Sequence, residues 1–483
     1  MRVTPSKPRF ALLSVAFLLL LALPTSASAR PFETGISGIG DYSPLSFERT
    51  RDAGARWVRL VVDWQGIAPN QKPDSWDPTN PGDSHYNWSY LDSGVTEAVR
   101  QGLNPLLLVD GAPKWAQRCN SPIGQTTELC DPDPAALAAF ATAAARRYSG
   151  TFGGLPRVQY WEGLNEPNYT GFFFPQFNTE FKALSPGLYR TLLNSFYDAV
   201  NGVDPSNIVI GGGLGPTEQK GINIGPLRFT RELLCMKGRE KPKPVPGCES
   251  GVRLDAIDVH SYTTGGPTHE GRPNDVQMGD LAKMQTLLKA ADKAGHVQGQ
   301  FKRTQLWITE FSWDSAPPDP NGLPMGILTQ WTAEALHEAW ANGVTHFFWY
   351  LLRDQPMTGE ESVVQSGLYF RADNLANDQP KEVLVSFRFP FVAFARKGRK
   401  GGLEYWGRTP TSQPGTVVLE AFRKGGWQQL ARVKADNVGI FRGKLKNRYG
   451  RNKRGAVRAL FANHSSVPFP MKRVGDFRHP PFG

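Results

Sequence analysis

The chain has 483 residues, of which 40% are hydrophobic, enough to bury a large core and to form two domains. Its net charge is +11 at neutral pH. Residues from Arg396 onward carry +16 (20 basic and 4 acidic side chains), whereas residues 30–395 carry about −8. A basic C-terminal part favours an anionic cell-wall polymer as a partner, but an arginine-rich composition alone explains it as well.

The N-terminus has the pattern of a secretory signal peptide. Basic residues precede the apolar run Ala11–Leu23, and Ala27 and Ala29 form a small-residue cleavage pattern. We therefore expect residues 1–29 to be removed and the mature chain to begin at Arg30. The run is short for a bilayer span, which needs about 20 residues, so an uncleaved anchor is the less favoured alternative. These features predict a secreted protein with no membrane association after cleavage, which argues against nucleic acid as its partner.

Four cysteines are consistent with secretion: Cys119, Cys130, Cys235 and Cys248. Three connectivities are possible. Pairing each cysteine with its near neighbour is the simplest, because each pair encloses a loop with Pro or Gly that a crosslink would rigidify. Reduced cysteines are the alternative. No Cys-x-x-Cys and no histidine at ligand spacing occurs, so the sequence predicts no metal site and no cofactor.

Short apolar segments bounded by Gly, Pro, Asp or Asn recur through the first 395 residues, which is typical of strands buried on both faces. The predicted strands are 34–40, 57–62, 105–109, 158–162, 208–211, 254–259, 305–309 and 346–351.

Segments with helical spacing lie between these strands: 135–148, 187–200 after Ser185-Pro186, 281–294, 328–341, and a last run from Pro380 through Phe387. Eight alternating strands and helices predict a (β/α)8 TIM barrel. A doubly wound open sheet is the alternative, but its phosphate-binding fingerprint is missing. The glycines of Gly211–Gly215 have the wrong spacing, so we interpret them as a tight strand exit.

The helical pattern stops at the Gly- and Lys-rich segment 397–402. Beyond it, short strand-like runs alternate with turn residues, with Trp427 as an expected core anchor. The predicted strands are 417–422, 430–433, 439–445 and 456–461. The α/β chain is therefore predicted to hold a (β/α)8 domain at residues 30–395 and a small basic β-sandwich at 400–483.

Two glutamates follow predicted strands, Glu166 in Trp161-Glu-Gly-Leu-Asn-Glu-Pro-Asn168 and Glu310 in Thr309-Glu-Phe311. The carboxyl ends of barrel strands meet at one face, so the two carboxylates can share a cleft. Two carboxylates that converge on a cleft are the apparatus of glycoside hydrolysis. Either motif alone is common on solvated loops, so the prediction depends on the order in which the motifs occur along the chain.

This arrangement resembles the glycoside hydrolases of clan A, barrel enzymes with catalytic glutamates on strands four and seven. The resemblance covers about residues 34–395, and the two motifs look most like families 5 and 39. The third predicted strand ends in Asp110-Gly-Ala-Pro113, where many family 5 enzymes have histidine. That departure and the following Pro113 and Trp115 look more like family 39.

The resemblance assigns roles to seven residues. Glu166 matches the general acid/base and Glu310 the nucleophile, while Asn165 matches the residue that binds the sugar 2-hydroxyl. The substrate-binding or supporting set comprises Arg59 on strand two, His260 and Tyr262 at the end of strand six, and Trp349 on strand eight as a platform under the reacting sugar. Each of the four also has an ordinary structural explanation, as an ion pair or as core.

Other side chains are weaker candidates. Glu162 is expected deeper in its strand, without a catalytic role. Aromatic residues in strand-exit loops could contact sugar or pack under loops: Trp64, Trp115, Trp313, Tyr169 and Phe172–Phe174.

The sequence thus predicts a secreted, retaining O-glycosyl hydrolase that cleaves a β-linked poly- or oligosaccharide through a glycosyl-enzyme intermediate. A transglycosylase with the same site is one alternative. A protein that binds carbohydrate or cell wall without catalysis is another, against which the presence of both glutamates argues. A third is an adhesive module driven by the basic C-terminal domain.

Overall fold

The structure is a computed structural model, and it describes residue 1 and residues 30–120, 129–248, 251–357, 364–396, 402–446 and 455–482. The predicted signal peptide, apart from Met1, lies outside the described residues, as does most of the predicted break at 397–402. No helix in the described ranges is long and apolar enough to cross a bilayer.

Eight parallel strands close into a barrel in the order β1-β16-β13-β11-β7-β5-β3-β2, which confirms the predicted TIM barrel. All eight predicted strands are present. Their bounds are β1 Glu33–Ser37, β2 Trp57–Asp63, β3 Asn104–Asp110, β5 Tyr160–Gly163, β7 Ile208–Leu214, β11 Ala256–Val259, β13 Gln305–Ile308 and β16 Val344–Tyr350.

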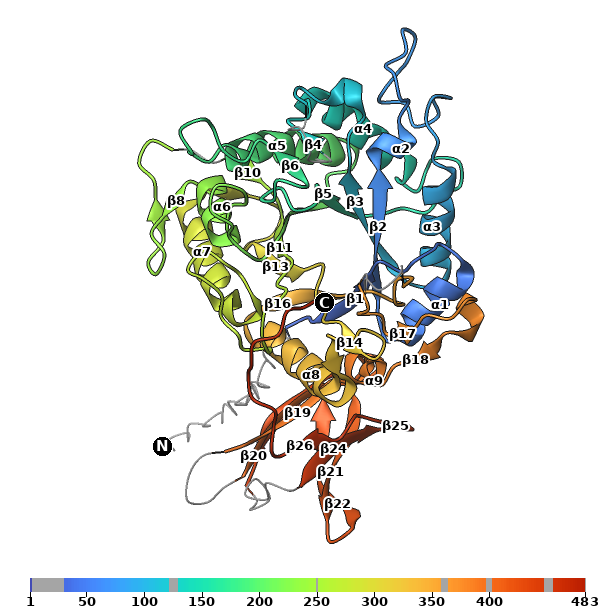
Figure 1. Cartoon of the computed structure of the whole chain (residues 1–483), viewed down its shortest axis with the longest axis vertical. Coiled ribbons are helices and arrows are strands. Elements are labelled where there is room, and N and C mark those ends of the chain that lie inside the picture. The colour runs from blue at the N-terminus through green and yellow to red at the C-terminus, as the bar shows by residue number, and fades with distance from the viewer. Residues whose placement is uncertain are drawn as a thin grey trace.

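Helices surround the barrel (Figure 1). They are α1 Pro44–Asp52, α2 Trp64–Ile67, α3 Ser89–Arg100, α4 Pro134–Arg147, α5 Ser185–Val203, α6 Pro226–Leu233, α7 Leu281–Ala294, α8 Met325–Ala341 and α9 Val383–Arg388, with 3-10 turns η1 Lys114–Ala116, η2 Met278–Asp280 and η3 Leu375–Asn377. Local chemistry sets their ends: the Asp133 side chain accepts from Ala135 N at the start of α4, and Gly295 closes α7 in the left-handed region. The predicted cap Ser185 instead lies inside α5, where its hydroxyl donates to Gln176.

The barrel has an inner and an outer apolar layer. The inner layer fills the barrel interior and comprises Trp57, Leu106, Ile208, Ile210, Ala256, Trp307 and Phe348. The outer layer lies between strands and helices and continues into the C-terminal sheets. Strands buried on both faces read as apolar runs in the sequence, which is why the strand predictions succeed.

Two antiparallel sheets follow the barrel and are consistent with a β-sandwich. One has the order β19-β20-β23; the other runs β22-β21-β24-β25, with β26 also on β24. The bounds are β19 Phe391–Ala395, β20 Leu403–Arg408, β21 Gly415–Arg423, β22 Gly426–Ala435, β23 Ile440–Leu445, β24 Ala456–Phe461, β25 His464–Ser465 and β26 Phe469–Pro470. The first strand of these two sheets, β19, begins at Phe391.

The core of the C-terminal sheets differs from the prediction in one respect. Trp427 is only half-buried, with the Arg458 guanidinium 4.2 Å from its ring centre. Trp406 and Phe441, which are 2% and 1% exposed, are core residues instead. Trp427 lies beside the turn between β21 and β22, where a side chain is covered from one side only.

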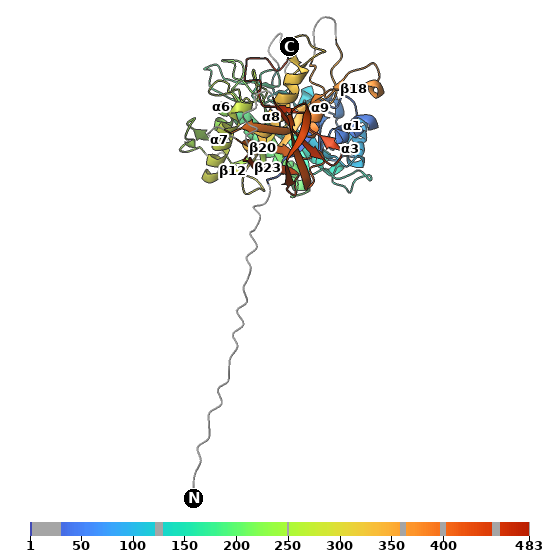
Figure 2. The ribbon, with the colours of Figure 1, turned by 90° about the horizontal axis from the view of Figure 1, so that it is seen from below.

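The sandwich packs against the base of the barrel and against α8 (Figures 1 and 2). The buried guanidinium of Arg408 on β20 donates to Thr34 Oγ1 on β1 at 2.9 Å, and Phe32 packs edge-on against Trp406. Helix α8 is covered on most sides because it lies between the barrel and these sheets.

Short two-residue strands decorate the loops: β4 Leu129–Cys130 with β6 Phe173–Phe174, β8 Met236–Lys237 with β9 Lys243–Pro244, β10 Val252–Arg253 with β12 Val297–Gln298, β14 Ser315–Ala316 with β15 Leu323–Pro324, and β17 Tyr369–Phe370 with β18 Gln379–Pro380.

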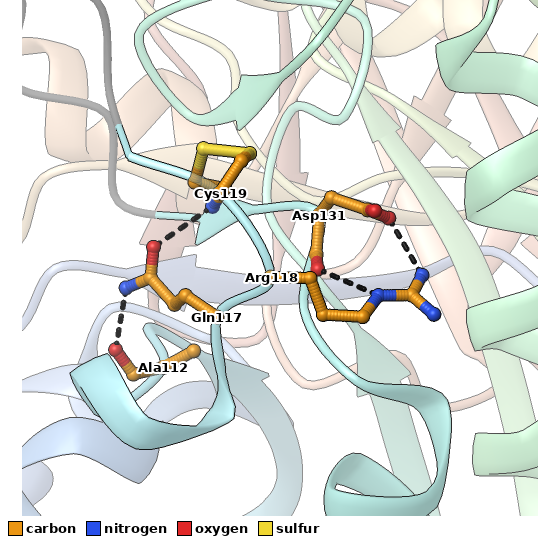
Figure 3. Close-up of a disulfide and its surroundings, with 6 residues drawn as sticks. Ala112, Gln117, Arg118, Cys119 and Asp131 are labelled. Atoms are coloured by element: carbon orange, nitrogen blue, oxygen red, sulfur yellow. Dashed lines mark hydrogen bonds and ion pairs between the residues drawn. A yellow bond between two sulfur atoms is a disulfide. The ribbon is translucent and has the colours of Figure 1, made fainter.

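The four cysteines form the predicted near-neighbour disulfides, Cys119–Cys130 and Cys235–Cys248. Figure 3 shows the first of them beside Arg118, whose guanidinium binds the Asp131 carboxylate at 2.7 Å. Nearby, Gln117 donates to Ala112 O at 2.8 Å, which connects this loop to the end of β3.

Candidate active site

The two predicted catalytic glutamates lie at the carboxyl ends of two barrel strands, on the same face. Glu166 follows β5 and Glu310 follows β13. The backbone N–H of Glu166 donates to Gly213 O on β7 at 3.1 Å. Leu164 and Glu166 have φ values of 68° and 41°, a region uncommon for residues with a Cβ. The neighbouring strand thus holds an unusual turn that presents the Glu166 carboxyl at the barrel mouth.

The His260 imidazole contacts both carboxylates. Its Nδ1 lies 2.8 Å from Glu166 Oε1 and 3.7 Å from Glu310 Oε2. These two oxygens are therefore no more than 6.5 Å apart, the sum of the two distances. The structure thus brings the two predicted glutamates together at one imidazole nitrogen.

Arg59 on β2 binds Glu310 and connects it to Asn165 and Glu162. Its Nη1 donates to Glu310 Oε1 at 2.6 Å, and its Nη2 donates to Asn165 Oδ1 at 3.0 Å. Its Nε and Nη2 also bind the two oxygens of Glu162, at 2.8 and 2.6 Å. Glu162 is fully buried, so it serves as the counter-ion that fixes Arg59 rather than as a group open to substrate.

A second polar row lies beneath the glutamates. His260 Nε2 is 3.2 Å from Thr309 Oγ1, and both the N–H and the hydroxyl of Thr309 bind the Asp258 carboxyl. Glycine in β7 makes room for this row, since a Cβ at Gly212 would lie 2.5 Å from Asp258 O. The predicted tight strand exit is therefore part of β7, and it lets the polar row come close to the strand.

The surroundings shift the pKa values of the two glutamates in opposite directions. Burial raises the pKa of Glu166, and the Glu310 charge adds to this, although His260 opposes it. Burial would also raise the pKa of Glu310, but the positive charges of His260 and Arg59 and the hydrogen bonds from Tyr262 and Arg59 lower it overall. Compared with an ordinary glutamate, the surroundings thus stabilise the protonated form of Glu166 and the ionised form of Glu310.

His260 and Tyr262 complete this charge pattern. Burial alone would lower the pKa of His260, but Glu310 and the bond to Glu166 raise it to about 9, so the ring is cationic at neutral pH. Tyr262 donates to Glu310 Oε2 at 3.1 Å. Burial and the Glu310 charge hold the pKa of Tyr262 well above its ordinary value, so its hydroxyl remains a donor.

Trp349 does not reach the cleft. Alternate residues of β16 face the barrel interior, where Phe348 belongs to the inner layer and His346 stacks on Trp307. Trp349 therefore faces outward, fully buried, near Phe387 of α9, and its Nε1 donates to Ser366 O at 2.8 Å. The placement corrects the predicted platform position, and the inward-facing neighbour Tyr350 lines the cleft instead.

An open cleft of about 550 Å³ extends from Glu310 over the ends of β1, β2 and β3. Its lining includes Ser37, Arg59, Val61, Asp63, Gln65, Asp110, Asn165, Phe172, Glu310 and Tyr350. Of the aromatic candidates, Phe172 lines it, whereas Trp64, Trp313 and Phe173 are fully buried. Polar and aromatic groups along an open groove suit a sugar chain.

Glu162, Asp258 and His260 bring potential metal ligands within 4.8 Å of one another. Their ligand atoms already have protein partners, however: Arg59 binds both oxygens of Glu162, and Thr309 binds both oxygens of Asp258. The cluster is a satisfied hydrogen-bond network, and these residues do not fit a metal centre.

Sequence reasoning missed Asp258, Thr309 and Tyr350. A signal for the first was present, because Asp258, His260 and Tyr262 recur at the period of two that places residues on one strand face. Tyr350 lies in the uniformly aromatic run Phe347-Phe-Trp-Tyr350, where no polar alternation shows which residue faces inward.

No protein-family model matches this sequence, and no curated protein matches it. Among solved structures, a family 39 glycoside hydrolase from the gut symbiont Bacteroides cellulosilyticus WH2 is similar, with a TM-score of 0.53, 18% identity, and coverage of 86% of this chain and 79% of that chain. A monomeric beta-xylosidase from Caulobacter crescentus CB15 has a TM-score of 0.49, 12% identity, and coverage of 89% and 96%. A GH30 endoxylanase from Clostridium papyrosolvens C71 has a TM-score of 0.46, 13% identity, and coverage of 87% and 94%. The first similarity supports the barrel fold of this chain.

Proposed function

We propose that the chain is a retaining glycoside hydrolase that cleaves O-glycosidic bonds of a β-linked poly- or oligosaccharide, with residues 30–395 as catalytic domain. The observation that carries this proposal is the pair of oxygens of Glu166 and Glu310 on one imidazole nitrogen, no more than 6.5 Å apart. Retaining enzymes separate their carboxyl groups by about 5–5.5 Å, and inverting enzymes by about 6.5–9.5 Å to admit a water molecule. An oxygen pair at or below 6.5 Å leaves little room for the water molecule of an inverting enzyme, which supports retention.

In this mechanism Glu310 attacks the anomeric carbon while Glu166 protonates the departing oxygen. The lowered pKa of Glu310 favours an ionised nucleophile, and the raised pKa of Glu166 favours a protonated acid, each relative to an ordinary glutamate. Glu166, now ionised, then takes a proton from a water molecule whose oxygen attacks the anomeric carbon. The bond between that carbon and Glu310 breaks, and the sugar leaves with its configuration retained. Asn165, held by Arg59, is positioned to bind the 2-hydroxyl, a hydrogen bond that strengthens as positive charge develops on the sugar.

A screen of aryl β-glycosides and soluble β-glycans, with proton NMR of the first-formed anomer, tests the proposal. We expect release of the β-anomer by the wild-type protein and none by Glu310→Gln, with the control Glu338→Gln, a half-buried glutamate of α8 that binds Asn342, still active. A first product of inverted configuration, or full activity of Glu310→Gln, would exclude the mechanism. An added sugar acceptor distinguishes a transglycosylase, which would form longer saccharides.

The two disulfides support secretion, because such bonds persist in oxidising compartments.

The basic C-terminal sheets support a role for residues 400–483 in binding anionic cell-wall polymer. Exposed Lys424 and Lys444 offer a test by substitution with glutamate. We expect binding to an anionic wall polymer to weaken in these variants and in high salt; salt-insensitive binding would contradict an electrostatic role.

A further inference from the structure

The chain does not end in the β-sandwich. After β26 the 472–482 segment leaves the sheets and runs along α8 to the catalytic end of the barrel (Figures 1 and 2). These residues were predicted to belong to the accessory domain, yet their side chains and backbone form hydrogen bonds with the barrel domain.

Polar contacts fix the first half of this segment. Arg473 binds Glu334 of α8 at 2.9 Å, and Val474 N donates to Gln330 of the same helix at 3.2 Å. The Asp476 carboxylate then accepts from Gly266 N at 2.5 Å and lies 3.1 Å from His269 Nδ1.

The loop after β11 is shaped to receive Asp476. A Cβ at Gly265 would lie 2.8 Å from Asp476 Oδ1, and one at Gly266 would lie 3.1 Å from the same atom. The adjacent glycines therefore permit a close approach that larger residues would obstruct.

The second half of the segment lies on the loops that carry the catalytic groups. His479 N donates to Thr264 O at 2.9 Å, and Asp314 N donates to Pro481 O at 2.8 Å. Phe482 meets the ring of Tyr262 edge-on at 4.9 Å between centroids. Because Tyr262 donates to Glu310, the segment reaches the immediate surroundings of the nucleophile.

The open cleft lies on the other side of Glu310. Its lining comes from the ends of β1, β2 and β3 and from Asn165, Phe172 and Tyr350, and includes no residue of the described 472–482 segment. Tyr262 lies at the edge of this cleft, because its hydroxyl binds Glu310 and its ring centre is 6.4 Å from that of Tyr350. Phe482 packs on the same Tyr262 ring.

We propose that the 472–482 segment closes the substrate cleft on the Tyr262 side, with Phe482 as the wall against which a chain-end sugar packs. This inference rests on the proposed glycosidase function and deepens it. The sugar that reacts at Glu310 is then the terminal unit of its chain, so the enzyme removes units from an end and does not cut internal bonds. An aromatic wall suits the apolar face of a pyranose, as aromatic rings do elsewhere.

The test uses the full chain, a variant with a stop codon after Arg478, and Phe482→Ala. Phe477→Ala is the matched control, because Phe477 lies in the same segment but packs on Trp331, with 4.7 Å between ring centroids. Carboxymethyl cellulose, arabinoxylan and mixed-linkage β-glucan serve as probes, and viscosity is followed together with reducing ends.

We expect wild type and Phe477→Ala to release reducing ends with little loss of viscosity. The truncated variant should lower viscosity several times more per reducing end, because internal bonds gain access. Phe482→Ala should raise KM for an aryl β-glycoside about tenfold, the value of one lost aromatic contact, with little change in kcat. A viscosity loss per reducing end that is the same in all four proteins would overturn the proposal.

Binding separates this proposal from the glycosidase function itself. Calorimetry with Glu310→Gln and its truncated counterpart compares mono- to hexasaccharides of the xylan and cellulose series. We expect the longer oligosaccharides to gain affinity only after truncation. If affinity depends on oligosaccharide length in the same way in both proteins, the segment does not close the cleft. If the wild-type protein binds sugars but cleaves none, the glycosidase function alone is overturned.

Discussion

At the scale of residues, Glu166 and Glu310 carry the same carboxyl group, but their pKa values shift in opposite directions because they accept from different sets of donors. Glu310 accepts from Arg59 and Tyr262 and lies near the His260 cation. Glu166 has the same cation at 2.8 Å but neither of the other two donors. Because hydrogen bonds and positive charge stabilise the ionised form, the difference in donors outweighs the burial that both groups share. The sequence predicted these partners through order along the chain, but not the Glu162 counter-ion that fixes Arg59.

The role of Glu166 can be isolated through the leaving group. In Glu166→Ala we expect kcat/KM to fall about 10²- to 10⁴-fold for alkyl or sugar leaving groups. Aryl glycosides with acidic phenols should keep the glycosylation step, since such groups depart without protonation. Pre-steady-state release of the phenol measures this step. An equal loss for all leaving groups in a folded variant would contradict the role of Glu166 as acid.

The Tyr262 hydroxyl predicts a shift in the pH profile. The activity depends on ionised Glu310 and protonated Glu166, so it is lost as pH falls through the lowered pKa of Glu310 and as pH rises through the raised pKa of Glu166. Tyr262→Phe removes a donor to Glu310, which should move the acidic limb of kcat/KM upward by about one pH unit. Tyr350→Phe is the control, because its hydroxyl makes no hydrogen bond to Glu310 among the described contacts. An unmoved acidic limb in Tyr262→Phe would show that this bond does not tune the nucleophile.

At the scale of elements, strand alternation decides which aromatic residue of β16 meets the substrate. The eight strands were predictable because burial on both faces gives apolar runs with clear polar borders. The same uninterrupted apolar run hid which of Trp349 and Tyr350 points into the barrel, since a run of aromatic residues has no polar residue to distinguish the two faces of the strand. Position along a strand could be predicted from the sequence, whereas side-chain direction at the strand end required the register with β1 and β13.

Substitutions of neighbouring residues on β16 should therefore have separate effects. Trp349→Ala should lower the free energy of unfolding by about 3–5 kcal/mol through a cavity beside α9, with KM unchanged below its melting temperature. Tyr350→Ala should raise KM with a smaller loss of stability, because its side chain borders open space. Urea denaturation and steady-state kinetics measure both quantities. A KM that rises in Trp349→Ala and stays constant in Tyr350→Ala would restore Trp349 as the sugar platform.

At the scale of the whole molecule, buried histidines set limits on stability from both sides of neutral pH. The pKa of His260 is raised to about 9, so its stabilising contribution is complete below pH 6.5 and is lost as pH rises toward 9. Burial lowers the pKa of His346 to about 3. As pH falls, this imidazole is protonated in the unfolded chain before it is protonated in the folded protein. Stability is therefore lost as pH falls from 6.5 toward 3.

We therefore expect the free energy of unfolding to be greatest near pH 6.5, as far as these two groups determine it. Chemical denaturation between pH 4 and 9.5 measures the profile. His260→Asn should flatten the alkaline limb and His346→Phe the acidic limb. Should each variant keep the slope of the wild-type protein, the histidines would not be the groups responsible.

The path of the 472–482 segment also bears on how freely this architecture can be recombined. Accessory modules of modular enzymes can be exchanged when the chain crosses between them once. Here it crosses at β19 and returns along α8 to the barrel mouth, so a cut before the sandwich discards the Asp476 and Phe482 contacts as well. Any chimaera that joins this barrel to a different module would have to restore those contacts separately. A deletion of residues 400–483 would remove the proposed polymer-binding sheets and the contacts of the 472–482 segment together.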